Sequence, residues 1–215
     1  MPTGNFGNVY AGYAARQMGL PIARLHVGAN RNDILARCLA ADDMSIAPVE
    51  PSLSPSMDIQ VSSNFERLLF DLYDRDGAAV AAAVASFRRS GRLALGEARL
   101  ARARAVFEGY RVDDDGTLAV MRGVWRATGE LVDPHSAIGI AAGWDGTEGE
   151  TPLVALATAH PAKFPDAVER ATGVRPPLPG LFADLLSRPE CCVVLPNDLA
   201  AVQAHVRGQR LQGAA

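Results

Sequence analysis

Short apolar runs alternate with helical segments along this chain, and this alternation restricts its fold more than any other feature. Residues 22–27 have the leucine and β-branched content of a strand. Residues 151–160 (TPLVALATAH) and 191–196 (CCVVLP) are apolar runs of strand length, which is typical of strands that a parallel sheet buries on both faces. The alternation therefore predicts an α/β fold, a three-layer domain with a mainly parallel sheet.

Helical segments are predicted between these runs from apolar spacing and from the positions of glycine and proline. The first covers residues 7–18, and a short helix follows Asn30 or Asn32, either of which can serve as its N-cap. The other predicted boundaries are Gly77, Gly91 and Gly96 between three helices, Asp133–Pro134 between two more, and Asn197 or Asp198 at the start of the last.

The stretch from Asp42 to Ser62 is predicted to be irregular, because prolines and serines interrupt it. It is too long for an idle connection in a compact domain, so we expect a loop that is either functional or disordered. A helix begins directly after it. Ser62, Ser63 and Asn64 are expected to cap that helix rather than to contact a substrate.

The composition restricts the partners and the location of the protein. The chain has 215 residues, of which 48% are hydrophobic, enough for the core of one domain or of two small ones. A net charge of −3 and a pI near 5.8 give no reason to expect nucleic acid or an anionic membrane as a partner. Because neither an apolar run of about 18 residues nor a secretory signal pattern is present, the cytoplasm is the expected location.

Three cysteines, Cys38, Cys191 and Cys192, are expected to be buried thiols. Adjacent cysteines are a poor disulfide, and the spacing is not that of a zinc site. We therefore predict no metal site.

The stretch Gly4-Asn5-Phe6-Gly7-Asn8 is a glycine-containing turn directly before the first predicted helix. Two glycines free the backbone to curl, so successive N–H groups can converge on an anion at the positive end of that helix. This describes a phosphate-binding cup, although a plain helix-entry turn has the same pattern. The lysine and hydroxyl of a P-loop and the third glycine of a dinucleotide fingerprint are missing, which disfavours ATP and NAD. A strand normally leads into such a turn, and none is expected here.

Three further stretches follow PTGNFGN in order, namely PSLSPSMDIQVSSNFERLLF, DPHSAIG and ATAHPAKF. Together these motifs closely resemble threonine synthases, which are pyridoxal-phosphate enzymes of the tryptophan synthase β-like fold (fold type II). The resemblance covers nearly the whole chain up to ATAHPAKF. It implies that Gly4, Asn5, Phe6, Gly7 and Asn8 hold the phosphate of the cofactor, and that Thr158 offers its hydroxyl to the pyridine nitrogen.

The local chemistry of Thr158 agrees with that role. Thr158 ends a predicted parallel strand, and open α/β sheets place ligands at such ends. A neutral hydroxyl suits an unprotonated ring nitrogen, whereas a carboxylate would favour the protonated form. A threonine that only satisfies backbone groups is the alternative. We expect His160 to be structural, and His135 either to pack against the same pocket or to be structural.

The chain departs from the family in its lysines, because Lys163 is the single lysine. In the family, the lysine that forms the Schiff base with the cofactor comes well before the glycine cup, so Lys163 is expected to face solvent at a helix entry. The resemblance implies that residues 1–215 are the C-terminal portion of the large cofactor-binding domain. The N-terminal half would then be absent, and no catalytic residue is assigned to this chain.

The activity that the resemblance implies is that of a phosphate-eliminating lyase in threonine biosynthesis. Such an enzyme converts O-phosphohomoserine and water to threonine and phosphate with pyridoxal phosphate. This chain alone is expected to be inactive and to have the missing N-terminal half as its partner. The alternative from another class is a non-catalytic α/β binding or interaction module that docks on a separate N-terminal half. A different β-replacement or dehydratase enzyme of the same fold is a third hypothesis, against which ATAHPAKF argues.

Overall fold

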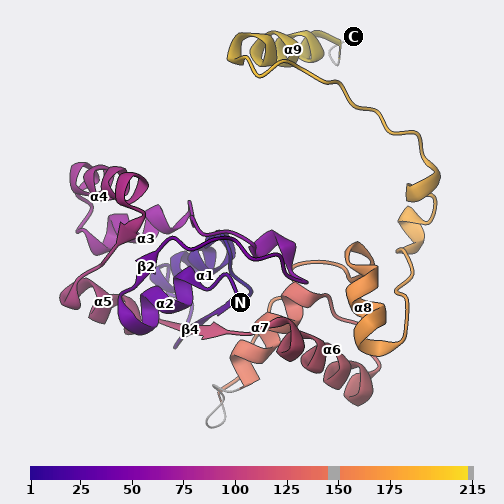
Figure 1. Ribbon diagram of the computed structural model, residues 1–215, viewed down its shortest axis with the longest axis horizontal. Helices are drawn as coiled ribbons and strands as arrows, with labels where there is room; N and C mark the ends of the chain where they lie inside the picture. The colour runs from indigo at the N-terminus through magenta and orange to yellow at the C-terminus, as the bar shows by residue number, and fades with distance from the viewer. Residues whose placement is uncertain (145–150, 213–215) are drawn as a thin grey trace. The chain divides into compact units, whose positions relative to one another are not determined.

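The computed structural model describes residues 1–144 and 151–212, and the chain forms two compact units, Met1–Pro177 and Leu178–Ala215 (Figure 1). The first unit contains, in chain order, α1 (Gly7–Gln17), β1 (Leu25–Ala29), α2 (Ile34–Ala41), β2 (Met44–Ser45), the 3-10 helix η1 (Pro55–Met57), α3 (Phe65–Leu72), α4 (Gly77–Ser90), β3 (Arg92–Leu93), α5 (Glu97–Arg104), β4 (Phe107–Arg111), α6 (Asp114–Thr128), α7 (Pro134–Trp144), η2 (Pro161–Lys163) and α8 (Pro165–Thr172). The second contains η3 (Gly180–Phe182), η4 (Leu185–Ser187) and α9 (Leu199–Gln212).

The central sheet is built on β1, which pairs in parallel with β4. Along the other edge of β1 run the first residues of the chain. The N–H of Gly28 donates to the carbonyl of Met1 at 2.9 Å, and the N–H of Thr3 donates to the carbonyl of Gly28 at 2.8 Å. A single parallel bridge between Pro2 and Gly28 therefore precedes the glycine turn, and the described elements include no strand there, as expected.

Helices cover both faces of this sheet, and two glycines allow their close approach. A Cβ atom on Gly28 in β1 would stand 3.0 Å from the carbonyl oxygen of Ile138 in α7, and one on Gly109 in β4 would stand 2.8 Å from the Cα of Ala36 in α2. Gly109 lies opposite Val27, the neighbour of Gly28, so the two glycines face opposite sides of the sheet. Helices α7 and α2 are thus the outer layers around parallel strands, and the predicted three-layer arrangement is confirmed.

Two hydrophobic cores hold the first unit together. The larger one packs α1, α2, α3 and α5 against the strands, and its fully buried members include Phe6, Val27, Phe65 and Phe107. The smaller one joins α6, α7 and α8 through Leu118, Met121, Ala137, Val168 and Ala171. The second core fixes the start of α7, and with it the polar cluster described below.

The predicted helix boundaries are confirmed for most elements, whereas two strand boundaries differ. The first strand begins at Leu25 rather than at residue 22. The helix predicted after Gly96 extends to Tyr110, but residues 107–110 of it belong to β4. Its alanine- and arginine-rich predecessor has a helical pattern, and only pairing with β1, which is remote in sequence, makes these residues a strand.

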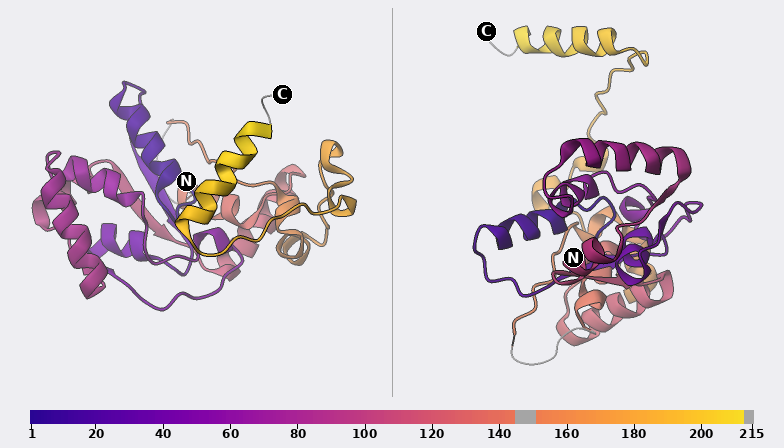
Figure 2. Two further views of the ribbon diagram at one scale, coloured as in Figure 1. Left: turned by 90° about the horizontal axis from the view of Figure 1, so that it is seen from above. Right: turned by 90° about the vertical axis from the view of Figure 1, so that its left-hand side faces the viewer.

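The apolar runs 151–160 and 191–196 form no strand, which corrects two predictions. Figure 2 shows both as irregular segments. Apolar content alone does not make a strand, because its backbone groups also need a neighbouring strand, and none among the described residues pairs with either run. Cys191 and Cys192 are therefore exposed, and of the three expected buried thiols only Cys38 is buried.

The second unit exposes much of its apolar surface. Leu181, Leu186, Val194 and Leu199 are each more than two-thirds exposed. The predicted start of its helix is confirmed, because the Asp198 carboxylate accepts from the N–H of Ala201 at 2.8 Å. None of the described helices is long and apolar enough to cross a membrane.

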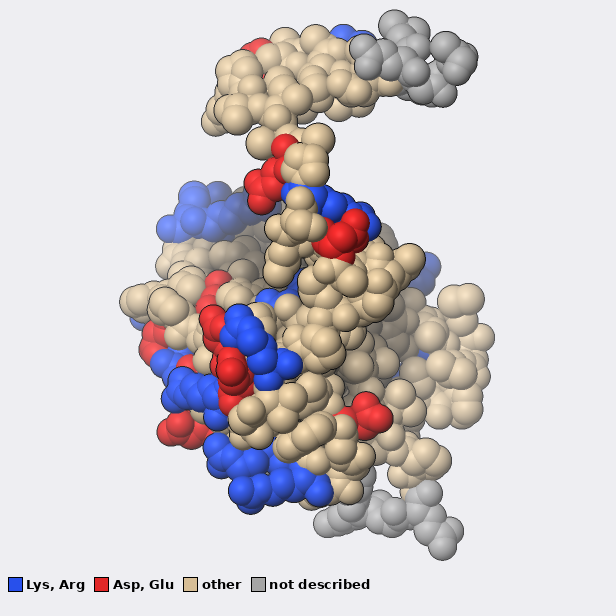
Figure 3. Space-filling model, turned by 90° about the vertical axis from the view of Figure 1, so that its right-hand side faces the viewer, with Lys and Arg blue, Asp and Glu red and all other residues tan. Residues whose placement is uncertain are grey.

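Charged side chains of both signs lie side by side on the face that Figure 3 shows. In α8 and the segment after it, Arg175 bridges Asp166 at 3.0 Å and Glu169 at 2.7 Å. Exposed pairs of this kind contribute little to stability.

Candidate functional site

The glycine turn Gly4–Asn8 is held in one conformation by the side chain of Phe6. Phe6 has a left-handed backbone, with φ of 64°, which is costly for a residue other than glycine. Its ring is 1% exposed and packs edge-on against Phe65, with 5.1 Å between ring centroids. Burial of this ring therefore offsets the strain and fixes the turn at the start of α1.

The start of α1 keeps its N–H groups available. Phe6 at the N-cap makes no side-chain capping hydrogen bond, and no acidic residue stands in the first turn. The first backbone bond joins the N–H of Tyr10 to the carbonyl of Phe6, so the N–H groups of Gly7, Asn8 and Val9 precede the hydrogen-bond ladder. Together with the helix dipole, they form a positive concavity suited to an anion.

Asn5 ties the turn to the start of α3. Its Oδ1 atom accepts from the N–H of Ser63 at 2.6 Å and from the Ser63 hydroxyl at 2.8 Å. Asn64, at the N-cap of α3, makes no side-chain capping bond, and Ser62 Oγ is buried with no hydrogen-bond partner among the described residues. The prediction that Ser62, Ser63 and Asn64 cap this helix is therefore wrong, because the N-cap makes no side-chain capping bond and Asn5 binds the turn that precedes the helix.

The 42–62 loop packs directly against the glycine turn. A Cβ atom on Gly4 would stand 2.9 Å from the Cα of Met57 and 3.2 Å from the carbonyl oxygen of Ser56. Only glycine fits at position 4 with the loop in this place. One wall of the turn is thus formed by the backbone of η1.

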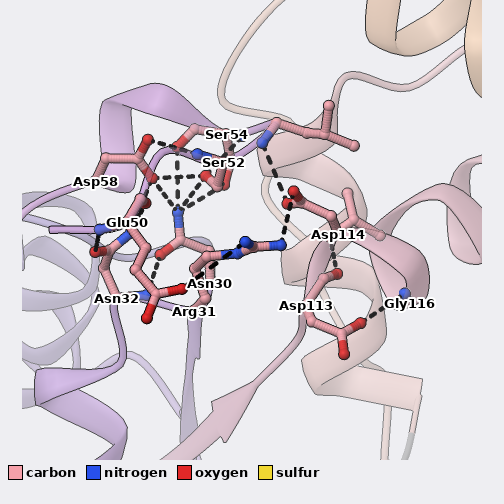
Figure 4. Close-up of polar contacts among 12 residues, drawn as sticks. Asn30, Arg31, Asn32, Glu50, Ser52, Ser54, Asp58, Asp113, Asp114 and Gly116 are labelled. Carbon is pink, nitrogen blue, oxygen red and sulfur yellow. Dashed lines mark hydrogen bonds and ion pairs between the residues drawn. The ribbon is translucent and has the colours of Figure 1, made fainter.

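A buried amide anchors the same loop to the C-terminal end of β1 (Figure 4). Asn30, which is 1% exposed, donates from Nδ2 to Asp58 at 2.7 Å and to the Ser52 hydroxyl at 2.8 Å. Asn32 donates to the carbonyl of Glu50 at 2.8 Å. The prediction that Asn30 or Asn32 caps α2 is wrong, because both side chains bind the loop instead. The loop is ordered, which rules out the disordered alternative.

Asp133, which is fully buried, is the centre of a second polar cluster. Its Oδ2 atom accepts from the N–H of His135 at 2.9 Å and from His135 Nδ1 at 2.7 Å. Its Oδ1 atom accepts from the N–H of Ser136 at 3.0 Å and from the Ser136 hydroxyl. Burial disfavours the charged carboxylate, but these hydrogen bonds outweigh burial and hold the pKa of Asp133 below its ordinary value.

The cluster connects the loop to Thr158. His135 Nε2 accepts from the N–H of Ser56 at 3.3 Å, which leaves Nδ1 as the ring nitrogen that donates to Asp133. Ser136 Oγ accepts from the N–H of Thr158 at 3.2 Å. Thr158 is exposed, and it lies in an irregular segment rather than at the end of a strand. The structure therefore links Thr158 to the glycine turn through these intermediate residues.

His160 and Lys163 lie outside this chain of contacts. His160 Nδ1 accepts from the N–H of Ala162 at 3.1 Å and so caps η2, as expected of a structural histidine. Lys163 is exposed, and its ammonium lies 5.7 Å from the centroid of the Phe164 ring. The expectation that Lys163 faces solvent is confirmed.

We expect Asp133→Asn to lower the free energy of unfolding at neutral pH by about 2–3 kcal/mol, because hydrogen bonds to a buried charge are lost. The pKa of Asp133 is lower in the folded state, so its stabilisation is present above the unfolded-state pKa and disappears as the pH falls through the folded one. Urea unfolding at pH 7 and below pH 3 measures this. The exposed Asp115→Asn is the control, and a stability difference that does not change with pH would contradict the assignment.

In each comparison, the chain is similar to threonine synthases. The family model described as threonine synthase, C-terminal, matches residues 136–206. The threonine synthase of Pseudomonas aeruginosa is 51% identical over 208 residues, which are 96% of this chain and 44% of that protein. The threonine synthase of Corynebacterium glutamicum is 39% identical over 214 residues, and the match again covers 96% of this chain and 44% of that protein.

Solved structures give the same result. The pyridoxal-phosphate-bound threonine synthase of Brucella melitensis superposes with a TM-score of 0.88 at 47% identity, covering 96% of this chain and 45% of that one. The yeast enzyme superposes with a TM-score of 0.84 at 29% identity, covering 98% and 47%. The predicted resemblance and the tryptophan synthase β-like fold are confirmed. The chain spans less than half the length of the relatives that it matches.

Proposed function

We propose that this chain, which is homologous to the C-terminal part of threonine synthases, provides the non-covalent cofactor contacts of such an enzyme. The observation that carries the proposal is the uncapped start of α1 behind a turn that Phe6 locks. In this proposal, the lysine that holds the cofactor covalently belongs to a second portion of the enzyme, which is the partner of this chain. Residues 1–215 are then the C-terminal portion of the cofactor-binding domain.

The residues present fit pyridoxal phosphate. The concavity at Gly4–Asn8 suits a phosphate group, and the buried Ser62 hydroxyl lacks a partner that a ligand can supply. Thr158 has an exposed side chain with a neutral hydroxyl, which can donate to an unprotonated ring nitrogen. Carboxylates are absent from the first turn of α1, so nothing there repels an anion.

The proposed mechanism assigns binding and orientation to this chain. Backbone N–H groups at Gly4–Asn8 would hold the cofactor phosphate, and the Thr158 hydroxyl would donate to the ring nitrogen. When bound, pyridoxal phosphate supplies the electron sink for loss of phosphate from O-phosphohomoserine and addition of water, which yields threonine. Lys163 takes no part, because a catalytic lysine is desolvated or placed beside another cation, whereas this one is exposed. The cytoplasm is the proposed location.

A non-catalytic docking module is the second candidate. The irregular apolar runs favour it, since Leu153 and Val154 are 44% and 74% exposed and offer surface to a partner. Both candidates require docking on a second portion, and they differ in whether the cup binds the cofactor. The comparisons name threonine synthases, which leaves the third hypothesis, another enzyme of this fold, without support.

Calorimetry with inorganic phosphate and with pyridoxal phosphate tests the proposal. We expect weak binding of both by the isolated chain, because only one part of the site is present. Thr158→Val should lower the affinity for pyridoxal phosphate by roughly 2- to 12-fold, the value of one hydrogen bond, and leave inorganic phosphate unaffected. The exposed Thr151→Val is the matched control. Absence of phosphate binding would favour the docking module, and submicromolar affinity for the cofactor would contradict the proposal that the site is incomplete.

A further inference from the structure

We infer that Asp133 is a positioning residue that holds the glycine turn and Thr158 in fixed relation to each other. This inference rests on the proposed function, since it concerns how the two cofactor contacts are aligned. Asp133 lies in neither contact, but its two carboxylate oxygens serve two separate branches of hydrogen bonds. Oδ2 serves His135, and Oδ1 serves Ser136.

The first branch leads to the phosphate side. Because Asp133 accepts a hydrogen bond from Nδ1 of His135, the other ring nitrogen, Nε2, is left as an acceptor for the N–H of Ser56 at 3.3 Å. The carbonyl oxygen of Ser56 is among the atoms that crowd Gly4. The His135 ring is held from the side by Phe164, with 4.6 Å between ring centroids. Through this branch, Asp133 sets the wall of the turn.

The second branch leads to the ring side. The Ser136 hydroxyl donates a hydrogen bond to Asp133. The same oxygen accepts a hydrogen bond from the N–H of Thr158 at 3.2 Å. Thr158 belongs to an irregular segment and has no strand pairing to hold its backbone. Ser136 is therefore the contact that fixes where the Thr158 side chain starts. Both branches depend on one buried carboxylate, through which the glycine turn and Thr158 are connected.

Two single-branch variants separate positioning from general stability. Ser136→Ala removes the acceptor for Thr158 and leaves His135 in place. His135→Phe keeps a ring against Phe164 but removes both ring nitrogens. Ser136→Thr keeps a hydroxyl at the same carbon, and the exposed Ser86→Ala in α4 is the matched control.

The readouts are calorimetric affinities for inorganic phosphate, which reports the turn alone, and for pyridoxal phosphate, which reports the turn and the ring. Ser136→Ala should lower the affinity for pyridoxal phosphate by roughly 2- to 12-fold and leave the affinity for inorganic phosphate unchanged. His135→Phe should lower the affinities for both ligands by the same factor. Ser136→Thr should restore the affinity, and Ser86→Ala should match the wild type.

A ligand-free measurement accompanies the titrations. In amide NMR spectra of the full chain, Ser136→Ala should shift the Thr158 N–H and leave the Ser56 N–H in place, and His135→Phe should do the reverse. Equal losses of both ligands in Ser136→Ala, or an unchanged Thr158 amide, overturn the inference alone. A wild-type chain that binds neither ligand overturns the proposed function and the inference with it. Thermal unfolding of each variant confirms that the chain is folded during the titrations.

Discussion

Gly4→Ala is expected to weaken inorganic phosphate binding by roughly 5- to 150-fold, the equivalent of overpacking a tightly packed site. The added Cβ atom would stand 2.9 Å from the Cα of Met57 and 3.2 Å from the carbonyl oxygen of Ser56. Both are backbone atoms, so no side chain can swing away. The loop is anchored by the buried Asn30 and the turn by the buried Phe6, so that either must be displaced.

Gly123→Ala is the matched control for this prediction. Gly123 lies in α6, and a Cβ atom there meets nothing within 4 Å. Binding should be unchanged, and the chain should gain about 0.5–1 kcal/mol from improved helix propensity. Calorimetry on both variants provides the comparison. Wild-type affinity in Gly4→Ala would show that the anion does not bind at this turn.

Under the proposed function, addition of the N-terminal portion of a threonine synthase should produce the largest change of all, from no activity to turnover. The match to the Pseudomonas aeruginosa relative covers 96% of this chain but only 44% of that protein. The exposed apolar runs around Val154 and Val194 are available to pair with strands outside this chain. We expect threonine formation from O-phosphohomoserine only when this chain is mixed with the separately produced N-terminal portion of a threonine synthase and pyridoxal phosphate.

Val154→Glu in this chain should abolish the complementation, because this exposed apolar run, once covered by the docked portion, would not accept an unpaired charge. The exposed Ala119→Glu in α6 adds the same charge elsewhere and should leave turnover intact. Activity in Val154→Glu equal to that of the wild type would show that this run is not part of the docking surface.

The helices could be predicted from local sequence signals. The strands could not, because they depend on pairing between residues that are far apart in sequence. Gly91, with φ of 67°, ends α4, and Pro134 occupies the first turn of α7, as glycine and proline preferences predict. The sheet depends on pairs such as Gly28 with Met1 and Val27 with Gly109, which no local pattern contains. Strands were therefore both missed, at β4, and predicted in excess, at the two apolar runs.

The same distinction applies to the site. The glycine turn is readable because two glycines precede a helix. The contacts that hold it join residues far apart in sequence, such as Asn5 with Ser63 and Asn30 with Asp58. The Asp133 cluster carries a usable signal, since aspartate followed by proline is a helix-start pattern that places Asp133 at the N-cap. That pattern predicts the capping of α7 but not the connection to Thr158.

Under the proposed function, this chain holds the cofactor without the covalent lysine. Borohydride reduction in the presence of pyridoxal phosphate, followed by mapping of the labelled peptide, tests it most directly. The chain alone should give sparse, slow labelling at Lys163 or at the amino terminus, and the complemented mixture should give stoichiometric labelling on the other polypeptide. Rapid, stoichiometric labelling of Lys163, with turnover of O-phosphohomoserine by this chain alone, would contradict the claim.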